Sequence, residues 1–102
     1  MNQGSMNYIC LVCGYPNLTE QPFDGVKFQS THEICPSCGF HYGYDDLNGT
    51  GDYPQHFNEW DIIKAYREKW IKDGSKWWSE NEVLPPNWNP VEQLKNIPEK
   101  FK

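Results

Sequence analysis

The residues of this chain best suited to chemistry are its four cysteines, which form two Cys-x-x-Cys pairs. Cys10 pairs with Cys13 and Cys35 pairs with Cys38, and 21 residues separate the two pairs. Two residues between cysteines allow a tight turn that directs both sulfur atoms at one ion, and two such turns can close a tetrahedral site. The spacing therefore predicts one metal site with four thiolate ligands, around which the N-terminal third folds.

The residues that follow each pair repeat as well. Gly14-Tyr15 follows the first pair and Gly39-Phe40 follows the second. A glycine at this point can take a positive φ, so the chain turns away from the sulfur atoms without a Cβ clash. The aromatic side chain after it can shield the site. This duplicated pattern favours metal binding over two unrelated pairs.

Two other uses of the cysteines are weaker. A disulfide within each pair would be strained and reducible, and a thioredoxin-type redox motif needs only one pair at the start of a helix. Three histidines are competing ligands, and His41 follows Cys38 with two residues between them. Because four thiolates already complete a tetrahedron, we expect the histidines on the surface or at an interface: His32, His41 and His56.

The spacing does not separate zinc from iron, because four thiolates hold either ion. Zinc is the preferred assignment on coordination grounds and iron is the alternative. A zinc ion held by four cysteines has no open position for water or substrate. The sequence also contains no catalytic triad pattern and no phosphate-binding glycine loop, so we expect no enzymatic activity.

The overall charge restricts the partners of this chain. Its 102 residues carry a formal charge of −5, and four thiolates with one divalent ion would make it −7. An acidic surface disfavours nucleic acid and anionic membranes and favours basic protein partners. The densest basic segment, Lys64 to Lys72 with Arg67, alternates with acidic residues, which indicates a solvated helix face.

Targeting signals are also absent from the sequence. No apolar run approaches the ~20 residues that span a bilayer, and no secretory signal is recognisable. Cysteine pairs without such a signal favour a cytoplasmic protein with reduced thiols. Residues 1–5 contribute nothing to the fold prediction, and whether they are native is left open.

Three short segments of the cysteine-rich part read as strands: Tyr8–Cys10, Val26–Gln29 and His32–Ile34. Residues 45–56 are polar, lack periodicity and read as a hinge that contains Asp45 and Asp46. These aspartates could suggest calcium, but the ligand spacing of an EF-hand is missing, so an acidic loop is the preferred interpretation.

The sequence of the second half of the chain predicts two helices. Apolar residues recur every three to four positions from Pro54 or Asn58 to Asp73, with Asp52 or Asn58 as the N-cap and Gly74 past the end. A short helix begins at Asn89-Pro90, where Glu92 can close a capping box, and Pro98 ends it. Trp77 and Trp78 cannot both face inward from one regular segment, so we expect one of them to be exposed or at an interface.

The paired motifs resemble the double knuckle of rubredoxins and rubredoxin-like zinc ribbons over residues 8–44. The interval between the pairs is shorter than in typical iron rubredoxins. Similarity is greater to the bacterial cysteine-rich CPCC-type proteins, through residues 10–18, Glu33–Phe40 and Asp45-Asp46. Here the first pair reads Cys-Leu-Val-Cys, where that family usually has Cys-Pro-x-Cys. The resemblance implies an accessory or immunity-type protein of bacterial toxin systems.

Together these observations predict a small α+β protein. A rubredoxin-like zinc ribbon of short antiparallel strands, residues 6–46, packs against a helical, Trp-rich extension, residues 47–102, in a single compact domain. We expect a non-enzymatic protein-binding module with an acidic surface, for which a basic toxin is a candidate partner. A rubredoxin-like iron electron carrier is the alternative. The sequence does not define the oligomeric state.

Overall fold

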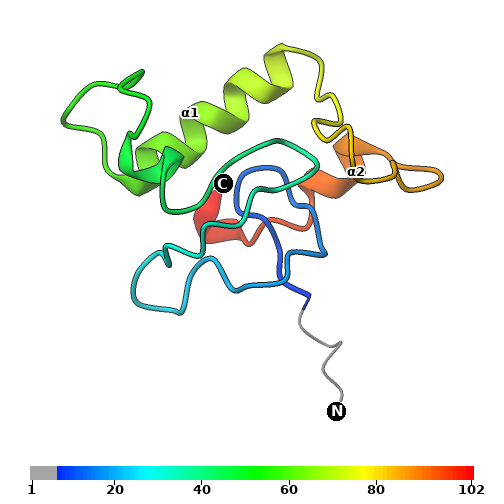
Figure 1. Ribbon diagram of the computed structural model, residues 1–102, viewed down its shortest axis with the longest axis horizontal. Coiled ribbons are helices and arrows are strands. Elements are labelled where there is room, and N and C mark those ends of the chain that lie inside the picture. Colours follow the sequence, from blue (N-terminus) through cyan, green and yellow to red (C-terminus); the bar gives the residue numbers. More distant parts are fainter. Residues whose placement is uncertain (1–6) are drawn as a thin grey trace.

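In the computed structural model, which describes residues 7–102, one long helix lies across a cysteine-rich set of loops (Figure 1). The first residue of the expected 6–46 module and the excluded residues 1–5 lie outside the described part. The described helices are the 3₁₀ helix η2, α1, α2 and the 3₁₀ helix η3, with bounds Asp45–Leu47, Glu59–Lys72, Pro90–Leu94 and Glu99–Phe101.

Helix α1 begins and ends where the sequence predicts. The Asn58 side chain accepts a hydrogen bond from the Asp61 N–H, and the Asp61 carboxylate accepts one from the Asn58 N–H. This reciprocal capping box identifies Asn58, and not Asp52, as the N-cap. Gly74 lies past the C-terminus with a φ of 107°, a value that few other residues take without strain. The helix buries Ile62, Ile63 and Trp70.

Helix α2 also starts at the predicted residues, although one prediction about it is wrong. The Asn89 side chain accepts hydrogen bonds from the N–H groups of Val91 and Glu92, and Pro90 takes the first helical position. Glu92 does not close a capping box. Its carboxylate lies 3.0 Å from the Lys95 ammonium, since an exposed Glu–Lys pair one turn apart is available on the helix surface.

The strands expected in the cysteine-rich part are reduced to isolated antiparallel bridges. These join Tyr8 to Leu18, Phe23 to Phe28, and Ile34 to His41. The Glu33 carboxylate accepts hydrogen bonds from the N–H groups of Thr19 and Glu20, which links these two segments beside the bridges. In the cysteine-rich part of residues 7–102, the antiparallel pairing thus consists of single bridges rather than extended strands.

Aromatic side chains form the packing between the N-terminal loops, α1 and the C-terminus. The Trp60 and Phe101 rings stack with centroids 4.7 Å apart, and both contact Phe23 and Phe28 edge-on. Such pairs contribute stability beyond their buried area. Residues from the N-terminal third and from the C-terminus thus meet at the start of α1.

The polar connection of residues 45–56 is held by specific hydrogen bonds. The buried Asp46 carboxylate accepts the Gly43 N–H, and burial raises the pKa of this carboxyl group. The Asn48 side-chain amide both donates to and accepts from the backbone of Tyr53. Helix η2, within this connection, packs against α1. None of the described helices has the length and apolar character needed to cross a membrane.

Candidate metal centre

The two Cys-x-x-Cys turns have matching backbone geometry. In the first turn, Cys10 C=O accepts the Gly14 N–H at 2.9 Å, and in the second, Cys35 C=O accepts the Gly39 N–H at 2.7 Å. The two glycines have φ values of 86° and 82°. Each first cysteine also donates its N–H to the carbonyl of the following aromatic residue, Tyr15 or Phe40. These turns are called the first and second knuckle below.

The knuckles bring all four sulfur atoms to one point. The ligand atoms of Cys10, Cys13, Cys35 and Cys38 lie within 4.8 Å of one another. The Cys10 and Cys38 sulfurs are 3.9 Å apart, and those of Cys13 and Cys35 are 3.7 Å apart. In a regular tetrahedron with metal–sulfur bonds of about 2.3 Å, the sulfur–sulfur edge is about 3.8 Å. The four side chains are therefore positioned to hold one metal ion.

The four cysteine side chains are buried, and this affects which of them can carry a negative charge. All four cysteines are free and buried, with at most 3% of any one exposed. Burial raises the pKa of the Cys35 and Cys38 thiols well above the usual range. For Cys10 the same burial is outweighed by hydrogen bonds from the three neighbouring thiols and Tyr42, which lower its pKa. A second thiolate so close to the first is disfavoured unless a divalent ion neutralises it.

Tyr42 supports the first knuckle from within the core. Its buried hydroxyl lies 3.2 Å from the Cys10 sulfur and accepts the Leu11 N–H at 3.0 Å. Since the oxygen accepts from Leu11, its proton can be donated to a Cys10 thiolate, and such second-shell donors orient metal ligands. Sequence reasoning missed Tyr42, although its position two residues after Phe40 places both on the same side of an extended segment.

Helix α1 contacts both knuckles. Arg67 donates hydrogen bonds to the carbonyls of Leu11 and Val12 in the first knuckle, and to Phe101 near the C-terminus. The Tyr66 hydroxyl donates to the Cys38 carbonyl in the second knuckle. The prediction that Arg67 lies on a solvated helix face is wrong, because its fork of donors satisfies three backbone carbonyls that would otherwise lack partners.

Helix α2 also joins the two knuckles, through Gln93. The buried amide of this residue donates to the Cys13 carbonyl at 3.2 Å and to the Ser37 hydroxyl at 2.9 Å, and its oxygen accepts the Trp88 indole N–H. Asn96 donates to the Gly14 carbonyl. Every polar atom of the Gln93 amide that faces the cluster therefore has a partner.

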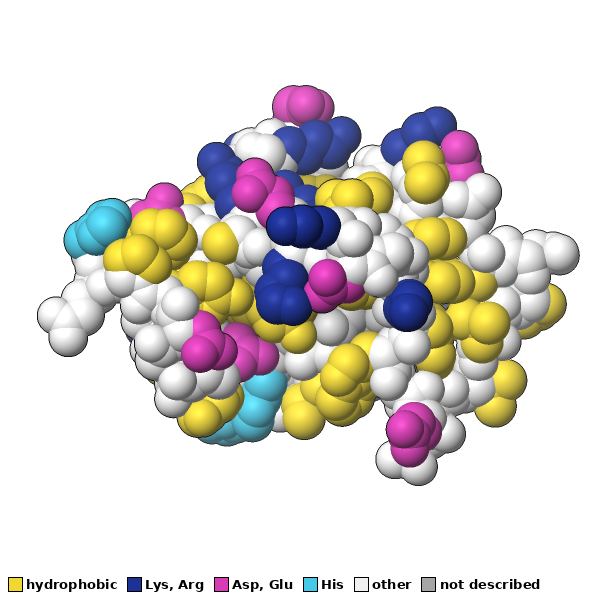
Figure 2. Space-filling view, turned by 90° about the horizontal axis from the view of Figure 1, so that it is seen from above, with side chains coloured by type: hydrophobic (Ala, Val, Ile, Leu, Met, Phe, Trp, Pro, Cys, Tyr) yellow, Lys and Arg dark blue, Asp and Glu magenta, His cyan; other side chains and the backbone are white. Residues whose placement is uncertain are grey.

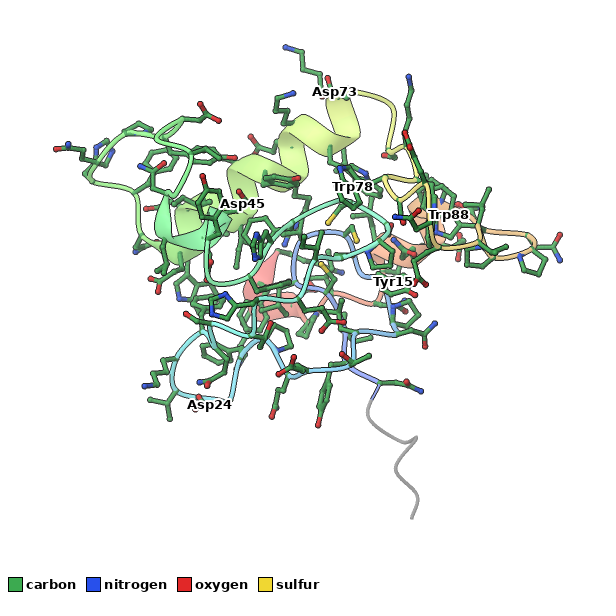
Figure 3. All side chains as sticks on the ribbon, viewed as in Figure 1. Tyr15, Asp24, Asp45, Asp73, Trp78 and Trp88 are labelled. Carbon is green, nitrogen blue, oxygen red and sulfur yellow. The ribbon has the colours of Figure 1, made fainter. Side chains whose placement is uncertain are left out.

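Both knuckle glycines are covered so closely that a larger residue would not fit. A Cβ at Gly14 would clash with the carbonyl oxygen of Gln93, and a Cβ at Gly39 would lie 2.5 Å from the Trp78 ring. Figure 3 shows Trp78 beside the cysteine-bearing loops. The second half of the chain is therefore packed directly on the two knuckles.

The other residues singled out by sequence are placed elsewhere. The group of side chains able to hold a metal among residues 7–102 contains the four cysteines and none of the three histidines. His32 and His56 are exposed, and His41 is half-buried. The Asp45 and Asp46 carboxylates accept backbone N–H groups of His41 and Gly43, in keeping with an acidic structural loop.

Sequence comparison places relatives of this chain in Bacillus subtilis (strain 168). The uncharacterized protein YoaQ is 37% identical over 71 residues, which cover 66% of this chain and 59% of YoaQ. The uncharacterized protein YozI is 39% identical over 78 residues, which cover 68% of this chain and 60% of YozI. The aligned region thus spans about 60% of each relative. No family model matches the chain, and no solved structure matches it. The chain is a homologue of these two uncharacterized bacterial proteins.

Proposed function

We propose that this chain is a small non-enzymatic protein whose fold is held by a structural zinc ion, and which acts by binding another protein. The observation that supports the zinc site is the set of four buried sulfur atoms at tetrahedral spacing. With four protein ligands, zinc has no vacant position for a substrate or a catalytic water. The proposed role of the ion is therefore to stabilise the fold and not to take part in catalysis.

The free energy of zinc binding is large enough for the ion to stabilise the whole fold. Structural zinc sites supply roughly 10–16 kcal/mol of apparent binding free energy, as much as the whole stability of a typical domain. The described cysteine-rich part has three isolated bridges in place of a sheet. Besides the buried core residues Leu11, Val12 and Leu18, its first residues are held by side-chain hydrogen bonds such as those from Arg67 and Gln93. Loss of the ion should therefore unfold this part first.

Zinc and iron are separated by elemental analysis of protein expressed without added metal. Zinc at one ion per chain, with a colourless protein, supports the structural role. Stoichiometric iron with a red oxidised form would instead favour the rubredoxin-like electron carrier, because four thiolates hold either metal.

An exposed loop offers a surface for the protein partner. The segment of residues 79–84 displays Glu80 and Glu82 beside Val83, which is 88% exposed, and Leu84, which is 49% exposed. Glu82 also lines a hollow together with Ile34. Exposed apolar side chains interleaved with carboxylates suit a partner with a basic, partly apolar face, and the acidic charge speeds its capture.

The resemblance to CPCC-type proteins and this charge together favour an immunity-type inhibitor of a basic toxin. Captures from extracts of the native host test the proposal with three baits. These are the unaltered chain, Glu80→Lys/Glu82→Lys, and the control Glu92→Lys/Glu99→Lys, which changes the net charge equally at exposed sites outside the loop. We expect a basic protein that the unaltered chain and the control retain and the loop variant loses. Equal retention by all three baits, or the absence of a basic partner, contradicts the proposal.

A further inference from the structure

A hollow of about 390 Å³ lies between the C-terminal half of α1 and the segment that follows it. Cys38 lines this hollow, and its walls are aromatic: Tyr66, Trp70, Trp77 and Trp78. Ligand sites of this volume, with mostly apolar walls, accept small organic molecules. Its location explains why Cys38 retains slight exposure while the other three cysteines are 0% exposed.

The polar groups of three wall residues already have protein partners. The Tyr66 hydroxyl donates to the Cys38 carbonyl, the Trp70 indole N–H to the Lys76 carbonyl, and the Trp77 indole N–H to the Glu82 carbonyl. What these walls offer a ligand is therefore the faces and edges of aromatic rings. A flat, apolar ring system is the ligand body that such walls contact best.

The rim of the hollow carries an excess of positive charge. The Lys69 ammonium is paired with the Asp73 carboxylate at 2.8 Å. Lys76 also lines the hollow, and among residues 7–102 its ammonium forms no ion pair within 4.0 Å. Figure 2 shows Lys and Arg side chains interspersed with Asp and Glu on the face seen from above. The unpaired lysine provides a partner for an anionic group.

We propose that this hollow binds a small aromatic acid, with its ring against the tryptophan walls and its acidic group at Lys76. The acidic group then points outward, because Lys69 and Lys76, the lysines that line the hollow, are exposed residues. This orientation places the apolar part of the ligand in the apolar part of the site. A cationic ligand would meet the unpaired ammonium of Lys76 at the rim, which disfavours it.

The first test titrates the metal-loaded full chain with three probes of the same size: 2-naphthoate, 2-naphthylmethylamine and 2-naphthylmethanol. Indole N–H signals in proton–nitrogen correlation spectra report the contact residue by residue. We expect 2-naphthoate to shift the Trp70, Trp77 and Trp78 signals saturably and to leave Trp60 unchanged, because Trp60 stacks on Phe101 outside this hollow. The absence of saturable shifts overturns the proposal, as does equal affinity for the amine or the alcohol.

The second test compares Lys76→Gln with Lys64→Gln, which removes an equal charge from an exposed position on α1 outside the hollow. Removal of one partner of an exposed charge pair should change the affinity by about twofold to fivefold. We expect Lys76→Gln to weaken 2-naphthoate binding by that factor and not to weaken amine binding, while Lys64→Gln changes neither. Equal effects of the two variants overturn the role of Lys76. Failure of these tests in a protein that retains its metal leaves the proposed zinc site intact.

Discussion

The hydroxyl group of Tyr42 lies 3.2 Å from the sulfur of Cys10, in a fully buried position. The same oxygen accepts the Leu11 N–H, so one side chain supports both a ligand sulfur and the backbone of its knuckle. Burial and the nearby Cys10 charge raise the pKa of Tyr42, which keeps the hydroxyl protonated as a donor.

Replacement of Tyr42 by phenylalanine tests this contact. Tyr42→Phe removes the donor to the sulfur and leaves the Leu11 N–H without its partner, which should cost about 1–3 kcal/mol of unfolding free energy. Loss of a second-shell group should also weaken metal binding by about tenfold to a hundredfold. Urea denaturation and competition with a chelator measure the two effects. The control is Tyr44→Phe, because Tyr44 is 45% exposed. Equal metal affinity in the two variants would show that Tyr42 does not support the metal site.

Gln93 should stabilise the packing of α2 on both knuckles. Gln93→Ala leaves the Ser37 hydroxyl, the Cys13 carbonyl and the Trp88 N–H without their partner. Buried groups without partners should lower the unfolding free energy of the metal-loaded protein by about 2 kcal/mol or more. Gln55→Ala, at an exposed position, serves as the control and should lie within about 0.5 kcal/mol of the unaltered protein. A loss at Gln93 no larger than at Gln55 would contradict the packing described here.

Glycine substitutions separate backbone strain from steric overlap. Gly14 and Gly51 both have positive φ, at 86° and 75°, but a Cβ at Gly51 would meet no atom within 4 Å. Gly51→Ala should therefore cost only the left-handed strain of about 1–2 kcal/mol. Gly14→Ala adds a clash with the Gln93 backbone and should cost at least about 1–3 kcal/mol more. Thermal unfolding measures the loss of stability in each variant. Equal losses in Gly14→Ala and Gly51→Ala would mean that α2 does not pack on Gly14.

Metal removal should invert the effect of pH on stability. In the loaded protein, thiolate ligands bind fewer protons than unfolded cysteines with a pKa of about 8.5, so stability is lost as pH falls from about 7 towards 5. In the metal-free protein, burial raises the pKa of Cys35 and Cys38 above the unfolded value. These two thiols then contribute stability below about pH 8.5 that is lost as pH rises further; the lowered pKa of Cys10 acts in the opposite direction, and the two raised pKa values outnumber it. Melting temperatures with zinc and with a chelator measure both trends, and parallel pH profiles would exclude thiolate ligation.

The features that the sequence predicts correctly are those encoded by nearby residues. The turn within each Cys-x-x-Cys pair, the Asn58 and Asn89 caps and the Gly74 terminus each depend on residues within a few positions of one another. The exposure of one residue of the Trp77-Trp78 pair also follows from local geometry, since Trp78 is 54% exposed.

The contacts that support the knuckles could not be predicted in this way. Tyr42, Arg67 and Gln93 reach knuckle residues that are 31, 55 and 80 positions away in the sequence. The sequence around these residues gives no sign of such contacts, because Arg67 belongs to a charged helix segment and Gln93 to a short amphipathic one. Their inward orientation depends on the tertiary packing of α1 and α2, which periodicity alone does not define. The Glu33 side chain likewise bonds the backbone of Thr19 and Glu20, 14 and 13 positions away, a contact that no local pattern predicts.

X-ray absorption at the metal edge tests the four-sulfur site most directly, because it reports the atoms bound to the ion and their distances. For protein purified without added metal, we predict a zinc edge with four sulfur neighbours at about 2.3 Å. Nitrogen or oxygen atoms in the first shell, or fewer than four sulfurs, would contradict the site formed by Cys10, Cys13, Cys35 and Cys38.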